Sequence, residues 1–283
     1  MNNISIFNGK VQAIIAENVL ADSFIWRVFE DFPDHLTTEE LELVERSKNH
    51  HLSKNFIYNR TNFALDFKQN EWASFLDISS SVSKFLRDGV NTRGFKRETD
   101  YQDKLFYQLM ILQYLLRRES GIENLRLYKL PFARIDYALN LLCQSQADAG
   151  WLRDYFYDNC NIPHLTNKRP YLNTRYWNNR TAFEPLTGET LKQPERAFAV
   201  YVVGNICRLE TRFYTSDAVR ALIQSRLGKG LGLENNLRSL LDSAVMNRVF
   251  WNDALHLFSP GDREKIGKSF NLKSAPALSF MNS

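Results

Sequence analysis

The stretch AFAVYVVGNICRLETRFY, residues 197–214, decides the fold because it contains two strands joined by a turn. Residues 197–203 are apolar apart from one tyrosine hydroxyl, as in a central strand. Gly204-Asn205 is a two-residue turn signal, and after it Arg208, Glu210 and Arg212 alternate with uncharged side chains. The stretch therefore predicts an antiparallel hairpin.

An earlier stretch, FARIDYAL at residues 132–139, has the same period of two and predicts a further strand. Side chains alternate across a strand, so Arg134 and Asp136 share one face of it. The second strand of the hairpin likewise carries an Arg-x-Glu-x-Arg motif on one face. Its members are Arg208, Glu210 and Arg212. If the two strands lie close in one sheet, two carboxylates and two or three guanidinium groups meet on one surface.

Such a surface suits phosphate chemistry. Asp136 and Glu210 supply the oxygen ligands that Mg²⁺ or Mn²⁺ prefers. Arg208 is a candidate for neutralising charge that develops on a transferred phosphate. Arg134 and Arg212 are candidates for binding phosphate oxygens through two hydrogen bonds each. A plain structural alternative stays open: acids and bases pair across the solvated face of an antiparallel sheet.

Between these strands lies a basic and aromatic segment, RPYLNTRYW at residues 169–177. Tyr171 and Tyr176 are candidate nucleophiles because a tyrosine hydroxyl can attack a phosphate that a metal polarises. Positive charge for a nucleic acid would come from Lys168, Arg169, Arg175 and Arg180. A mixture of basic and aromatic side chains is also typical of single-strand binding surfaces, and tyrosines that merely anchor a surface loop remain the alternative.

The order of these motifs resembles the Rep-trans type of rolling-circle replication initiators of plasmids and phages. That family has a strand like Thr-Arg-Ile-Asp, then Tyr-x-Gly-Ser-Arg, then a strand like Arg-x-Glu followed by a helix. Residues 134–136, 171–175 and 208–210 are similar to the three elements, and the resemblance covers about residues 130–226. Asn173 stands where the family has glycine, and Tyr201 is not followed by the family's Asp-Lys.

The resemblance implies a metal-dependent endonuclease that starts DNA replication. Asp136 and Glu210 would bind the metal, and Tyr171, with Tyr176 as its competitor, would attack one DNA strand. The products would be a 5′-phosphotyrosyl link and a free 3′-hydroxyl.

The rest of the chain predicts an α+β fold, with a helical N-terminal region followed by a mainly antiparallel sheet with packed helices. We expect a mostly helical region over residues 1–95, an α+β core over 96–260 and an irregular tail over 261–283. Thr37-Thr38-Glu39-Glu40 opens a helix in the first region, and the leucine stripe in residues 101–118 predicts another. The basic segment 90–100 is expected to be a loop, which can be an ordinary solvated connection or can hold a phosphate backbone.

Composition narrows the class of protein. Among 283 residues the net charge is +4, so the chain is only mildly basic and a nucleic-acid partner is permitted but not demanded. Three cysteines without a Cys-x-x-Cys pair indicate neither a disulfide framework nor a cysteine zinc site. No signal peptide or membrane span is evident, so we expect a soluble, cytoplasmic protein.

The sequence leaves three function classes open. The leading hypothesis is DNA nicking and strand transfer by a tyrosine. The second is a non-catalytic module of phage or plasmid origin that binds nucleic acid or protein through the same sheet face. The third is a structural or assembly protein, and no feature specifies an oligomeric state.

Overall fold

The computed structural model describes most of the chain. The described residues are 4–8, 10–15, 17–29, 36–46, 51–69, 74–81, 84, 98–179 and 195–272, with the backbone alone at residues 8 and 98–106. Within them lie strands and helices in similar measure, so the α+β class is confirmed.

The central hairpin forms as the sequence predicts. β10 (Arg196–Val203) and β11 (Ile206–Phe213) pair in antiparallel fashion, with Val203 opposite Ile206. Gly204 has φ +59 in the turn between them, a conformation that glycine adopts without steric cost. On its other side β11 pairs with β7 (Phe132–Cys143), so the two charged strands are direct neighbours.

Eleven strands of the described residues form one antiparallel sheet, in the order β4-β5-β6-β3-β7-β11-β10-β9-β8. β2 also pairs with the far end of β7, and β1 pairs with β2. The remaining strands are β1 (Ile4–Asn8), β2 (Val11–Ile15), β3 (Leu20–Phe29), β4 (His51–Tyr58), β5 (Thr61–Gln69), β6 (Ser74–Ser81), β8 (Asn167–Tyr171) and β9 (Thr174–Asn178).

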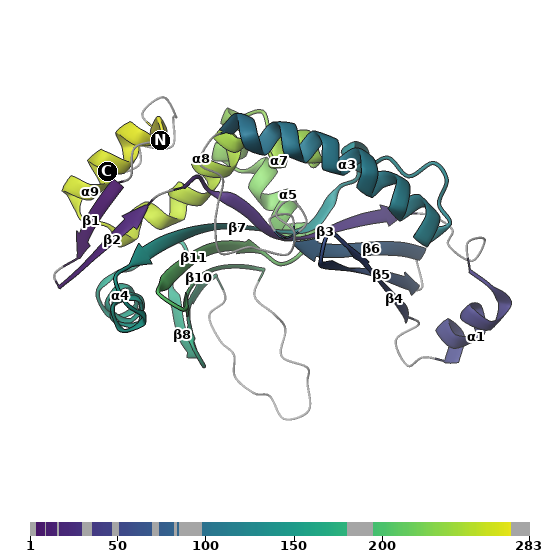
Figure 1. The fold of residues 1–283 in the computed structure, drawn as a ribbon, viewed down its shortest axis with the longest axis horizontal. Coiled ribbons are helices and arrows are strands. Elements are labelled where there is room, and N and C mark those ends of the chain that lie inside the picture. The colour runs from purple at the N-terminus through teal and green to yellow at the C-terminus, as the bar shows by residue number, and fades with distance from the viewer. Residues whose placement is uncertain are drawn as a thin grey trace.

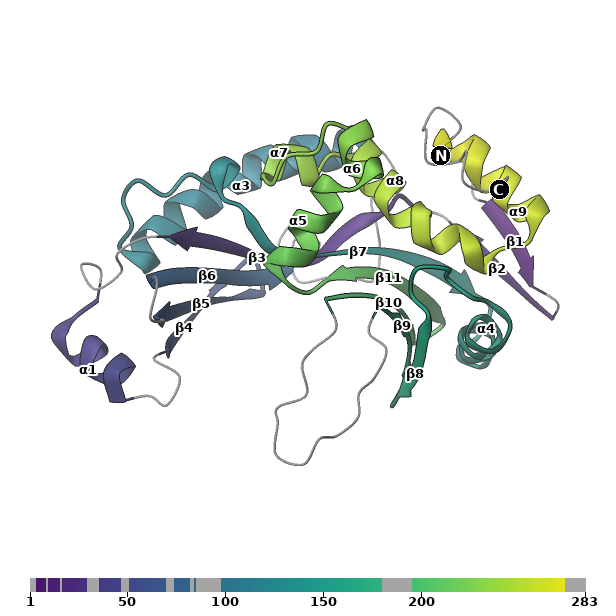
Figure 2. The ribbon, with the colours of Figure 1, turned by 180° about the vertical axis from the view of Figure 1, so that it is seen from behind.

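Helices cover one face of this sheet. Figures 1 and 2 show an arched sheet with α3, α5, α7 and α8 along its outer side and α4 at the end near β8. Phe250 of α8 packs on Phe198 of β10, and Phe156 of α4 packs on Phe258, so α4 and α8 share this face. The helices are α1 (Thr38–Arg46), α3 (Glu98–Ser120), α4 (Gln146–Asn159), α5 (Ser216–Gln224), α6 (Arg226–Gly230), α7 (Leu237–Leu240), α8 (Ser243–Ala254) and α9 (Pro260–Ser269), with short 3₁₀ turns η2 (Leu127–Lys129) and η3 (Leu255–Leu257).

Several helix starts follow from their caps. Ser145 accepts a hydrogen bond from the Asp148 backbone N–H at the start of α4, and Thr215 accepts one from Ala218 at the start of α5. At α1, Thr37 and Glu40 form a reciprocal capping box. These polar side chains satisfy backbone N–H groups that would otherwise lack partners.

The expectation of a mostly helical N-terminal region over residues 1–95 is wrong. The first helix, α1, begins only at Thr38, and strands β1–β6 make up most of the described residues around it. The cause is visible in β5, where Phe63, Leu65 and Phe67 are buried and the residues between them are not. This is the period of two that a strand requires.

The sheet also crosses the boundary expected near residue 95, because β3 pairs with β7. Near the C-terminus, α9 begins at Pro260, where an irregular tail was expected. Ser259 caps this helix, and proline suits its first turn. The basic segment 90–100 lies outside the described residues except for its last three positions, which open α3. None of the helices that the structure describes is long and apolar enough to cross a membrane.

Candidate functional site

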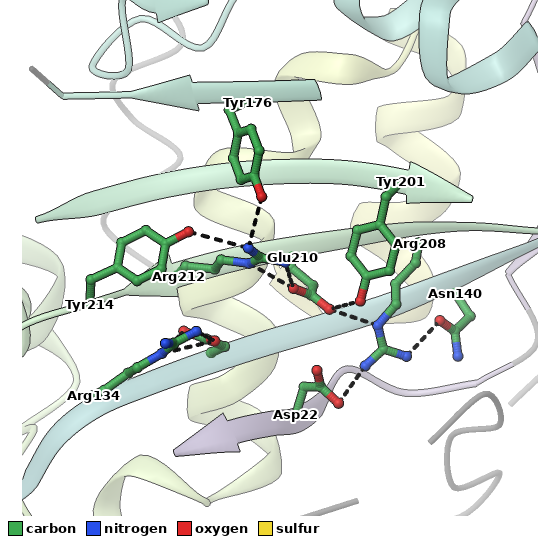
Figure 3. A network of polar contacts seen from close by, with 10 residues as sticks. Asp22, Arg134, Asn140, Tyr176, Tyr201, Arg208, Glu210, Arg212 and Tyr214 are labelled. Atoms are coloured by element: carbon green, nitrogen blue, oxygen red, sulfur yellow. Dashed lines mark hydrogen bonds and ion pairs between the residues drawn. The ribbon is translucent and has the colours of Figure 1, made fainter. Parts of the chain in front are cut away.

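The strand register places Asp136 and Glu210 on the same face of the sheet. Arg212 is opposite Asp136 and Glu210 is opposite Ala138, so the two acids are diagonal neighbours on adjacent strands. Both residues are buried, each with 1% of its surface exposed. The face is the one that the helices leave uncovered, and Figure 3 shows its side chains in front of the helices.

Glu210 is the centre of this face. Its Oε1 accepts hydrogen bonds from Arg208 Nε at 2.8 Å and from the Tyr201 hydroxyl. Its Oε2 accepts from Arg212 Nε at 2.7 Å and Nη2 at 2.5 Å. Both carboxylate oxygens are therefore engaged by donors, as Figure 3 shows.

Arg208 extends the cluster toward β3 and β7. Its Nη2 lies 2.7 Å from Asp22 Oδ1, and its Nη1 donates to Asn140 Oδ1 at 3.1 Å. The register of β3 against β7 shifts between Ala21 and Phe24, and Asp22 lies in that irregularity. Arg208 is 2% exposed and is held by two carboxylates and an amide.

Arg212 connects Glu210 to two tyrosines. Its Nη1 donates to Tyr176 Oη at 3.3 Å and to Tyr214 Oη at 3.2 Å. Arg134 stacks over the Tyr214 ring at 4.9 Å and donates to Asp136 Oδ2 from Nη2 at 2.6 Å. We call this set the carboxylate–arginine network. Its charged members are Asp22, Arg134, Asp136, Arg208, Glu210 and Arg212.

The two central acids have opposite electrostatic environments. Burial raises the pKa of Asp136 to about 6, although Arg134 and Arg212 lower it, and the charge of Glu210 raises it further. Burial also acts to raise the pKa of Glu210, but Arg212, Arg208 and Tyr201 outweigh it and hold that pKa at about 2. Burial and the nearby Glu210 charge raise the pKa of Tyr201 well above its ordinary value.

The donor set of the network fits a hard divalent cation. Mg²⁺ is commonly held by one or two carboxylates, with waters completing its coordination. A cation shared by Asp136 and Glu210 would remove the repulsion by which Glu210 raises the pKa of Asp136. To reach Glu210 Oε2 it would have to replace Arg212. No group of three or more His, Cys, Asp and Glu side chains suited to a metal occurs in the described part of the chain.

The β8–β9 hairpin divides the predicted basic and aromatic residues between two faces. Register aligns Arg169, Tyr176, Ala199 and Glu210 in one row across the sheet. Tyr171 lies in the next row and is 58% exposed at the hairpin end. Thus Arg169, Tyr171 and Tyr176 share the face of the network.

Lys168 and Arg175 do not join that face. Lys168 Nζ donates to the Tyr157 backbone oxygen of α4 at 2.6 Å, and Arg175 Nη2 pairs with Asp154 of α4 at 2.8 Å. Strand alternation turns both side chains away from Tyr176, so neither places its positive charge beside that hydroxyl. Arg180 lies outside the described residues.

The sequence reasoning missed four members of the site, Asp22, Asn140, Tyr201 and Tyr214. Tyr201 could have been predicted from the sequence, because the register that the Gly204-Asn205 turn imposes pairs it with Arg208. Asn140 continues the period of two from Arg134 and Asp136. Asp22 had no sequence signal, because it belongs to a strand that was expected to be helix.

Comparisons with protein-family models, with curated proteins and with solved structures gave no match. The function of the chain is therefore inferred from the geometry of this face.

Proposed function

We propose that this chain nicks a DNA strand and holds its 5′ end through a tyrosine, as a replication initiator does. The observation that carries the proposal is the shared face: Asp136 and Glu210 are diagonal neighbours, and Arg212 links Glu210 to the Tyr176 hydroxyl. Carboxylates, guanidinium groups and a hydroxyl are the groups that phosphoryl transfer requires.

Tyr176 is the proposed nucleophile. Its hydroxyl lies 3.3 Å from Arg212 Nη1, whereas the structure gives Tyr171 an exposed position at the end of the hairpin. In the reaction, Tyr176 Oη bonds to a backbone phosphorus and the phenolic proton goes to solvent. The bond from phosphorus to the 3′ oxygen breaks, and that oxygen takes a proton from water.

The other residues of the face bind and orient the strand. Arg212 lies beside the attacking oxygen and can donate to the phosphate as its charge develops. Arg169 and Tyr171 extend the face along β8 toward the flanking nucleotides. A Mg²⁺ or Mn²⁺ ion held by Asp136 and Glu210 would polarise the phosphate.

A second candidate, non-catalytic nucleic-acid binding through this face, is favoured by one observation. Both oxygens of Glu210 already accept hydrogen bonds, and Asp136 is paired with Arg134. In this candidate function the acids hold the arginines in place, and the nucleic-acid strand contacts only the exposed residues of the face.

A covalent-adduct assay separates the two candidates. The full chain is incubated with Mn²⁺ and a pool of single-stranded oligonucleotides of random sequence, and denaturing gels detect protein–DNA adducts. We expect an adduct with the parent chain and with Tyr171→Phe, and none with Tyr176→Phe or after chelation of the metal.

The contrary outcomes are distinct. An adduct that persists in Tyr176→Phe would assign the chemistry to another residue, and Tyr201→Phe would be tested next. Absence of an adduct from every variant, together with weaker binding of single-stranded DNA by Arg169→Gln, would support non-catalytic nucleic-acid binding instead.

A further inference from the structure

A pocket of about 400 Å³ opens on the helical side of the sheet, away from the carboxylate–arginine network. One wall is apolar and comes from α5, α6 and the sheet, with Leu222, Leu227 and Phe213 among its residues. The other wall is polar and includes His164, Asn179, Arg196 and Asn252. A volume of this size, with an apolar wall facing a few polar groups, is typical of small-molecule sites.

The polar wall is fixed in place by Asp253, a fully buried residue of α8. Arg196 Nη2 lies 2.5 and 2.7 Å from the two Asp253 oxygens, and His164 Nε2 lies 2.7 Å from Oδ1. Thr211 donates to Oδ2 at 2.5 Å. Burial acts to raise the pKa of Asp253, but Arg196, His164 and Thr211 outweigh it, so that pKa lies below its ordinary value.

This anchoring leaves hydrogen-bonding capacity on the pocket side. Asp253 engages Nη2 of Arg196, whereas Nη1 makes no hydrogen bond to another described residue and the side chain is 24% exposed. His164 contacts Asp253 through Nε2, which fixes the position of its ring. A ligand at this position would need to supply an acceptor, because the N–H groups of Arg196 Nη1 have no acceptor among the described residues.

We propose that this pocket binds a small organic anion, with its apolar body against α5 and α6 and a single carboxylate, sulfonate or phosphate group at Arg196. A guanidinium matches such a group in charge and in donor geometry. The other two charged residues of the lining, Glu195 and Arg226, have opposite signs and leave this preference unchanged.

The pocket is independent of the proposed nicking site. Phe213 lines the pocket, whereas its neighbour Arg212 belongs to the network, and consecutive strand residues point to opposite faces. A ligand in the pocket therefore does not contact Tyr176 or Glu210, and either proposal can fail without the other.

The probe for the test is 1-anilinonaphthalene-8-sulfonate, which joins an aromatic body to one sulfonate. We expect its fluorescence to rise and saturate at one molecule per chain when it is titrated with the full protein. Naphthalene-1-sulfonate should displace it at a concentration at least about ten-fold lower than the neutral 1-naphthalenemethanol, because the sulfonate makes charge-assisted hydrogen bonds with Arg196.

A matched pair of variants locates the binding. Ala221→Trp adds bulk at an exposed residue of the pocket lining, and Gln224→Trp adds the same bulk at an exposed residue of α5 outside the lining. We expect the first variant to weaken probe binding at least about ten-fold and the second to leave it unchanged, with equal circular dichroism spectra. Equal binding by both variants, absence of saturable binding by the parent, or equal displacement by the neutral alcohol would each overturn the proposal.

Discussion

Glu210 and Asp136 show how two buried carboxyl groups on one face acquire opposite properties. Glu210 receives four hydrogen bonds from two arginines and a tyrosine, and its pKa falls to about 2. Asp136 has Arg134 as its hydrogen-bonding partner and feels the charge of Glu210, and its pKa rises to about 6. The two carboxyl groups should therefore make the stability of the fold depend on pH in opposite directions.

Glu210 stabilises the fold only while it is ionised. Its pKa in the folded state lies below the ordinary 4.5, so its contribution is present above pH 4.5 and is lost as the pH falls toward 2. Glu210→Gln should cost about 3–5 kcal/mol at pH 7, because it leaves the buried guanidinium groups without their carboxylate. In a plot of the urea midpoint against pH, the variant should also show a smaller decrease between pH 4.5 and pH 2.

The control for this variant is Glu264→Gln, which removes an exposed carboxylate paired with Lys268 on α9. It should change the free energy of unfolding by less than about 0.5 kcal/mol. Similar decreases in the free energy of unfolding of the two variants would contradict the stabilising role of Glu210.

Asp136 acts in the opposite direction. Its folded pKa lies above the ordinary 3.8, so the folded state binds the extra proton and stability falls as the pH rises from 3.8 to about 6. Asp136→Asn mimics the protonated carboxyl and should remove this slope from urea midpoints measured between pH 4 and pH 7. A slope that survives in the variant would assign the titration to another group.

At the scale of elements, the sequence predicted the parts whose signals are local. The Gly204-Asn205 turn set the register of β10 against β11, and Thr37-Thr38-Glu39-Glu40 marked the start of α1. The sequence could not predict that β3 supplies Asp22. Short apolar runs fit a helix or a strand equally well, and this run is a strand because it pairs with β7. The turn of Lys168 and Arg175 toward α4 likewise depends on a tertiary contact.

Two glycines allow a test of these elements with changes of opposite sign. Gly204→Ala places a Cβ on a residue with φ +59 and should lower the free energy of unfolding by about 1–2 kcal/mol. Gly150→Ala lies inside α4, where nothing stands within 4 Å of the new Cβ, and should raise it by about 0.5–1 kcal/mol. Both changes are read from urea denaturation, and equal signs would contradict the assigned turn or the assigned helix.

At the scale of the whole molecule, one sheet joins the N-terminal strands to the candidate site. Trp26 of β3 is fully buried and packs against Phe24 and against Phe132 of β7. The network itself spans this junction, since Asp22 of β3 pairs with Arg208 of β11. The N-terminal strands are thus expected to stabilise the site.

Trp26→Ala should lower the free energy of unfolding by about 3–5 kcal/mol, because it leaves a cavity at the β3–β7 junction. Hydrogen exchange in β10 and β11 should accelerate together with that in β3. Phe29→Ala, at an exposed position of the same strand, should cost less than about 1 kcal/mol. Faster exchange confined to β1–β6 would show that the sheet does not unfold as one unit.

The most direct test of the account is to find where Mn²⁺ binds, by anomalous X-ray scattering from crystals of the full chain soaked in the metal. We expect one ion coordinated by both Asp136 and Glu210, with Arg212 displaced from Glu210 Oε2, and no ion in Asp136→Asn crystals. An ion bound elsewhere, or a carboxylate–arginine network that keeps all its ion pairs in saturating Mn²⁺, would contradict a shared metal site on these two strands.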